Sequence, residues 1–175
     1  MNKEKLSSKL KNRYAKYLRN FIFGVGDSLV SSVGVLSGVA VVGTSPKTIV
    51  LAGVVLIFVE AFSMGVGSLL SENAAKEFKE DREVSMRHSL VPSFIMFSSY
   101  FFAGFIPLLP YMFLGVKTAF PVSIMSALFA LFILGMVSAR LRGREIFRHG
   151  MEMFLIGGTA IGLGVIVGTI VNSLN

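Results

Sequence analysis

Apolar residues are concentrated in five long stretches of the chain, and most polar and charged residues fall between them. A helix that crosses the hydrocarbon core of a bilayer needs ~20 predominantly apolar residues. The stretches that reach this length lie at about 20–42, 48–70, 91–114, 118–139 and 151–172. They take up most of the 175 residues, so the pattern predicts an all-α membrane protein whose five transmembrane helices form one domain, residues 20–175.

The composition agrees with a membrane protein. Hydrophobic residues make up 53% of the chain and charged residues only 15%, with a mean hydropathy of +0.71. A soluble domain of this length would carry more charge and shorter apolar runs. The chain contains no cysteine, which excludes disulfide bonds and thiolate metal sites.

The basic residues alternate between the two sides of the predicted membrane domain. Seven Lys or Arg precede residue 20, four lie between the second and third spans, and four lie between the fourth and fifth. The other two connections hold one each, Lys47 and Lys117. Because the side richer in Lys and Arg faces the cytosol, we expect a cytoplasmic N-terminus and a C-terminus outside. The formal charge of +7 therefore indicates a lipid bilayer as partner, and no nucleic acid.

The first 19 residues form a basic segment whose apolar positions recur at helical spacing. Two interpretations stay open: an amphipathic helix along the anionic inner leaflet, or a solvated basic arm. No small-residue cleavage site follows a short apolar core, so the segment is not typical of a signal peptide. A short chain without an organelle signal favours the inner membrane of a prokaryote.

Residues 71–89 are rich in helix formers and free of Gly and Pro, which predicts a short cytoplasmic helical continuation of the second span. Two interpretations of its acidic side chains stay open. They form an ordinary solvated face whose negative charge is balanced by Lys and Arg, or they form a patch that collects cations at a metal entry. The glutamates that would form such an entry are Glu72, Glu77, Glu80 and Glu83.

Asp27 and Glu60 are acidic residues inside the apolar spans. A charge at the bilayer centre costs at least ~2.5–3.5 kcal/mol, so such residues usually face a bundle interior or a water path. At ~1.5 Å per residue, Asp27 lies roughly 10 Å from the inner end of its span, at nearly the depth of Met64. Glu60 lies one turn deeper. If the first two helices are neighbours, the three side chains share one zone.

Two carboxylates and a thioether together favour a borderline divalent ion such as Fe(II), Mn(II), Co(II) or Zn(II). Buried carboxyl groups also take up protons readily, so they could exchange protons against metal. The alternatives are that Met64 only packs, and that each acid pairs with a hydroxyl or basic group. Near the inner edge of the fifth span, Glu152 lies close in sequence to His149 and Arg148, which favours a structural ion pair.

The sequence gives little support to catalysis. The only histidines, His88 and His149, lie at inner membrane edges, and no glycine-rich phosphate-binding motif is present. We therefore expect no enzyme and no permanent cofactor. Pro107 and Pro110 interrupt the third span and predict a kink, which is a possible hinge or polar backbone lining.

The stretches FGVGDSLVSSVGVLSGVA and VLAGVVLIFVEAFSMGVGSLLS, with the later GFIPLLPY, resemble the vacuolar iron transporter family. The resemblance covers nearly the whole chain. It implies a homodimer of five-helix subunits, with the ion path at the dimer interface, and proton-coupled export of Fe(II) and often Mn(II) from the cytosol. Asp27 matches the family's membrane aspartate, Met64 its methionine, and Glu60 an acid found in some members.

Two departures from the family pattern stand out. Ser68 occupies a position where many members carry a glutamate. The long glutamate-rich helical insertion of plant-type members is replaced by the short connection at 71–89. The sequence thus predicts a dimeric Fe(II) or Mn(II) transporter, with a passive cation channel and a non-transporting membrane scaffold as the alternatives.

Overall fold

The computed structural model describes residues 3–174, and it describes their side chains from Leu10 onward with the exception of Asn12. Residues 1–2 and the side chains of residues 3–9, which belong to the predicted basic segment, lie outside the described part. The helices are α1 (Lys3–Val41), α2 (Pro46–Glu80), the 3₁₀ helix η1 (Met86–His88), α3 (Leu90–Phe113), α4 (Val116–Arg142) and α5 (Ile146–Ser173). Within residues 3–174 there is no strand, and five helices are long and apolar enough to cross a membrane. The predicted all-α architecture is confirmed.

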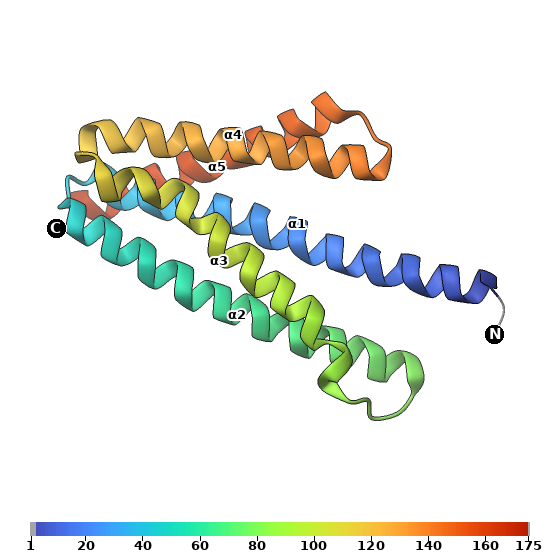
Figure 1. The fold of residues 1–175 in the computed structure, drawn as a ribbon. Coiled ribbons are helices and arrows are strands. Elements are labelled where there is room, and N and C mark those ends of the chain that lie inside the picture. Colours follow the sequence, from blue (N-terminus) through green and yellow to red (C-terminus); the bar gives the residue numbers. More distant parts are fainter. Residues whose placement is uncertain (1–2, 175) are drawn as a thin grey trace.

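Helix α1 is the centre of the bundle. It packs mainly against α3 and α5 and also touches α4, whereas α2 packs mainly on α3 (Figure 1). A tight turn joins α1 to α2, with Gly43 at φ +77° and Pro46 as the first residue of α2. The Ser45 hydroxyl caps α2 by accepting a hydrogen bond from the Thr48 amide at 3.2 Å.

Small residues bring α1 and α5 into backbone contact. A Cβ atom on Gly38 would lie 2.6 Å from the Gly164 carbonyl oxygen, and one on Gly34 would lie 3.2 Å from the Ala160 oxygen. Gly168 faces Gly38 in the same way. Lipid tails are as apolar as the side chains, so there is little hydrophobic driving force for helices to associate in a membrane. Van der Waals packing between closely approaching helices is therefore a main source of association energy there.

The three basic regions of the sequence gather at one end of the bundle, which we call the basic end. Figure 1 shows the start of α1, the α2–α3 connection and the α4–α5 connection there, with the other two connections and the C-terminus opposite. Helices α2 and α5 are the most open to the surroundings, and only 6% of the apolar window of α5 is buried.

Three local expectations can be compared with the structure. The basic segment is helical and forms the first part of α1, and its position relative to the lipid surface stays a prediction. The connection at 71–89 is α-helical only to Glu80, because Asp81 takes a left-handed conformation (φ 50°) that ends α2, and the short 3₁₀ helix η1 follows it. Helix α3 continues through Pro107 and Pro110 without a break. The carbonyl of Ile106, which loses its helical partner to Pro110, accepts a weak hydrogen bond from Ser126 at 3.5 Å.

Candidate functional site

Asp27 and Glu60 lie half-buried on α1 and α2, close enough for their carboxylates to repel each other. Neither forms an ion pair with any side chain that the structure describes. Three other carboxylates in the helices, those of Glu72, Glu80 and Glu152, are each paired with a basic side chain. The two unpaired carboxylates are therefore available to a cation that the chain itself does not supply.

Asp27 and Met64 line adjacent grooves rather than one cavity. The Asp27 groove, of about 580 Å³, lies between α1, α4 and α5. The Met64 groove, of about 500 Å³, lies between α1, α2 and α3. Arg19 and Phe23 of α1 line both grooves, so these two side chains stand between the aspartate and the methionine.

The Asp27 groove continues toward the opposite end of the bundle. A further groove of about 700 Å³ follows α1 and α5, and it shares Val30 with the Asp27 groove. Its lining includes Ser31, Gly34 and Gly38 on the α1 side. A groove along the α1–α5 contact thus continues from Asp27 toward the opposite end, and at its floor Gly34 and Gly38 of α1 pack against the α5 backbone.

Tyr100 of α3 belongs to the same region, and sequence reasoning missed it. Its side chain is fully buried, its hydroxyl lies 2.7 Å from the Ser31 hydroxyl, and its backbone carbonyl accepts a hydrogen bond from Ser28 at 2.6 Å. A tyrosine inside an apolar run counts as hydrophobic, so the pattern gave no signal for it.

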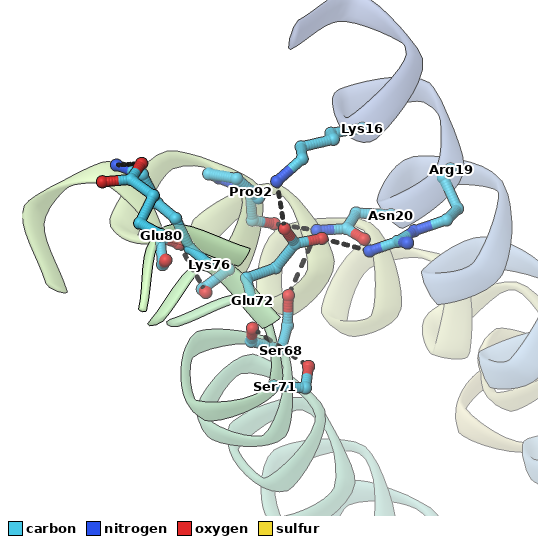
Figure 2. Close-up of polar contacts among 11 residues, drawn as sticks. Lys16, Arg19, Asn20, Ser68, Ser71, Glu72, Lys76, Glu80 and Pro92 are labelled. Atoms are coloured by element: carbon cyan, nitrogen blue, oxygen red, sulfur yellow. Dashed lines mark hydrogen bonds and ion pairs between the residues drawn. The ribbon is translucent and has the colours of Figure 1, made fainter. Parts of the chain in front are cut away.

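The four glutamates of the predicted cytoplasmic entry do not converge. Glu72 is buried and bound by Lys16, at 2.6 Å, and by Arg19 (Figure 2). Glu77 accepts hydrogen bonds from the Asn73 side chain and the Val84 amide, Glu80 pairs with Arg82, and Glu83 is exposed. Throughout the described residues, no group of three His, Asp or Glu side chains is placed to hold a metal ion.

The remaining candidate residues have structural contacts. Glu152 binds His149 at 2.6 Å and Arg148 at 3.2 Å, which confirms the predicted ion pair. Pro107 is fully buried, and its carbonyl accepts a hydrogen bond from Ser123 of α4 at 2.6 Å. The hinge at Pro107 and Pro110 stays a prediction. Ser68, at the position where many family members carry a glutamate, is buried, and its hydroxyl accepts a hydrogen bond from the Asn20 side chain at 3.1 Å.

A bundle of five apolar helices with unpaired carboxylates inside it defines a multi-pass integral membrane protein of the kind that carries polar cargo. A family model described as the VIT family matches residues 18–91 and 78–169. The chain therefore belongs to the VIT family.

Two curated relatives are similar over most of their length. Vacuolar iron transporter 1 of Arabidopsis thaliana is 23% identical, with 82% of this chain and 81% of the relative covered. Vacuolar iron transporter 1 of Eucalyptus grandis is 22% identical, with 82% of each chain covered. The alignments span 203 residues, whereas 82% of this chain is only about 143, so the relatives carry roughly 60 residues without a counterpart here. The two family matches meet at residues 78–91, which agrees with a shortened α2–α3 connection.

Proposed function

We propose that the protein is a metal-ion transporter that moves Fe(II) or Mn(II) out of the cytosol in exchange for protons. Membership of the VIT family supports a metal-ion transporter, and it agrees with the expectation that the chain is not an enzyme. The choice of iron follows the names of the two relatives. Manganese, proton coupling and the direction of transport are the finer parts of the proposal.

The observation that carries the proposal is the unpaired state of Asp27 and Glu60 inside the apolar spans. Two neighbouring carboxylates without a basic partner repel each other, and they are relieved by a shared proton or a cation. A divalent ion balances both charges at once, and protons take its place when it leaves. Met64 in the adjacent groove supplies a soft thioether ligand on the side of α2.

We propose a homodimer with the metal path between two copies of α1. The Asp27 groove and its continuation between α1 and α5 offer an apolar surface for a second copy. The described part of one chain offers only Asp27, Glu60 and Met64 as ligands, with Asp27 and Met64 in separate grooves, which is few for a metal ion. Two copies would double this set around the shared axis.

The orientation and the host membrane belong to the same proposal. The basic end faces the cytosol by the positive-inside rule, so Asp27 lies nearer the cytosolic entrance. We propose the inner membrane of a prokaryote, on the ground of the short chain. The relatives are named as vacuolar proteins of plants, so an organelle membrane is the alternative, and tagged protein localised in its own host decides between them.

Metal flux into proteoliposomes tests the function. Purified protein is reconstituted with and without an imposed pH gradient, and uptake of Fe(II), Mn(II), Zn(II) and Ca(II) is measured. We expect saturable, gradient-driven uptake of Fe(II) or Mn(II) that Asp27→Asn reduces to the level of protein-free vesicles. The matched control is Asp81→Asn, which makes the same chemical change at an exposed position on the basic end.

Three other outcomes would contradict parts of the proposal. Flux that a pH gradient cannot drive uphill would indicate a passive channel. Flux that Asp27→Asn leaves intact would remove this residue from the path. Absence of flux for every ion, from protein shown to be folded and dimeric, would indicate a membrane scaffold in which the acids serve only helix association.

A further inference from the structure

Among the described side chains, Glu72 is the most buried carboxylate at the basic end, and its partners are far more exposed than it is. Its side chain is 6% exposed, whereas those of Lys16 and Arg19 are 49% and 66% exposed. One basic group binds each carboxylate oxygen (Figure 2). The carboxylate is therefore fixed by the fold, while both cations sit on long side chains that can turn into water.

The helix turn that precedes Glu72 is anchored by hydrogen bonds that do not involve its carboxylate or the two cations. The Asn20 side chain donates hydrogen bonds to the Ser68 hydroxyl at 3.1 Å and to the Pro92 carbonyl at 3.0 Å, which joins α1, α2 and α3 one turn from Glu72 (Figure 2). Ser71 lies beside Glu72 in sequence, with its hydroxyl bonded to the Ser68 carbonyl at 3.3 Å. A carboxylate and two hydroxyls are thus clustered on α2.

The two hydroxyls of this cluster and the Arg19 partner of Glu72 line the Met64 groove. Arg19, Asn20, Ser68 and Ser71 line its basic end and Met64 lines it farther in, whereas Glu72 itself lies outside the lining. A cation that enters from the basic end toward Met64 passes Ser68, Ser71 and Arg19 first. Hard oxygen ligands of this kind bind divalent ions such as Mn(II) well.

We propose that Glu72 forms a cation-exchange subsite, which Lys16 and Arg19 occupy at rest and a divalent metal ion occupies during entry. The idea rests on the proposed transport function. Losing both basic partners would leave a buried charge uncompensated, which is strongly unfavourable. A divalent ion carries the same total charge as the ammonium and guanidinium that it replaces, so the exchange preserves the charge balance around Glu72.

The exchange also links entry to the position of Arg19. Its guanidinium lines both the Met64 groove and the Asp27 groove, so at rest a positive charge stands at the mouth of each. Binding of Arg19 to Glu72 holds that charge at the entrance and repels incoming cations. Metal binding at Glu72 releases the side chain, which then turns outward from both mouths.

Equilibrium binding of Mn(II) to purified protein tests the subsite without requiring transport. The background is Asp27→Asn/Glu60→Gln, which disables the two membrane carboxylates. In this background we expect Lys16→Gln/Arg19→Gln to tighten Mn(II) binding about fivefold or more, the factor expected when half-exposed ion pairs no longer compete. Adding Glu72→Gln is expected to abolish this tight binding.

The matched control is Arg140→Gln/Arg144→Gln, which removes two exposed positive charges from the same end without touching Glu72. An equal gain in the control would show a general surface-charge effect and overturn the proposal. So would unchanged binding in Lys16→Gln/Arg19→Gln.

Instability of the double variant would not hide the result. Lys16→Gln alone keeps Arg19 on the carboxylate, and a smaller gain in Mn(II) affinity is expected from it. Added Mn(II) should also raise the thermal midpoint of Lys16→Gln more than that of the parent. If Lys16→Gln changes neither the Mn(II) affinity nor the effect of Mn(II) on the thermal midpoint, the subsite is refuted and Glu72 only joins α1 to α2 through its ion pairs. None of these measurements uses metal flux. A negative binding result would therefore refute the subsite without refuting transport, and a negative flux result would refute transport without refuting the subsite.

Discussion

Replacing Gly38 by alanine tests how closely α1 and α5 approach each other. The new Cβ would lie 2.6 Å from the carbonyl oxygen of Gly164 and 3.1 Å from its carbonyl carbon. Ordinary contact begins near 3.4 Å, so the two backbones must separate by about 0.8 Å. Backbone atoms of a packed helix cannot rotate away as a side-chain end can. Overpacking of this kind costs about 1–3 kcal/mol.

The measurement is the fraction of protein that stays monodisperse after heating in detergent. For a chain of this size, 1–3 kcal/mol corresponds to a midpoint lowered by roughly 2–12 °C. Gly162→Ala on α5 is the control, because no atom lies within 4 Å of the position where its Cβ would be. A Gly38→Ala midpoint equal to that of wild type would refute the backbone contact between the two helices.

Three further predictions follow from single contacts. Tyr100→Phe removes the hydrogen bond to Ser31 and should lower the free energy of unfolding by about 1 kcal/mol, and an unchanged thermal midpoint would contradict that bond. Met64→Leu keeps the side-chain volume but removes the thioether, so competition uptake should show a larger loss for Zn(II) and Fe(II) than for Mn(II); equal loss for all metals would assign Met64 to packing. Asp81→Val places a β-branched residue at φ 50° and should cost about 1 kcal/mol, seen as faster amide exchange in the last turn of α2, whereas unchanged exchange would argue against the left-handed cap.

The five helices could be predicted because each apolar run has the length that a bilayer requires. The alternation of basic residues likewise predicted which connections share one end of the bundle. The sequence did not reveal that α1 is central and that α2 packs mainly on α3, since packing order depends on shape along the whole helix. The path through Pro107 and Pro110 was also missed, because a partner on α4 supports a carbonyl there and lies outside any local pattern.

The candidate site was predictable in part. Asp27 and Glu60 stood out because charge is rare in an apolar run, and the structure places both half-buried and without an ion pair to any described side chain. The separation of Asp27 from Met64 by Phe23 was not foreseen. Two residues at the same depth on α1 and α2 can still line grooves on different sides of α1. Glu72 was one of four similar glutamates in the sequence, and only the fold distinguishes it by burying it against Lys16 and Arg19.

The hydroxyl contacts from α4 to α3 have a consequence for how the chain enters the membrane during synthesis. Helix α3 carries two prolines, and Pro110 leaves the Ile106 carbonyl without a helical donor, so that its side-chain contact is the weak hydrogen bond from Ser126 of α4. Only two residues separate the helices, Leu114 and Gly115. Until α4 arrives, that carbonyl would face hydrocarbon without any donor, which is unfavourable. Helices α3 and α4 are therefore expected to enter the lipid together as a helical hairpin. Helix α3 would stay at the insertion machinery until α4 has been synthesised.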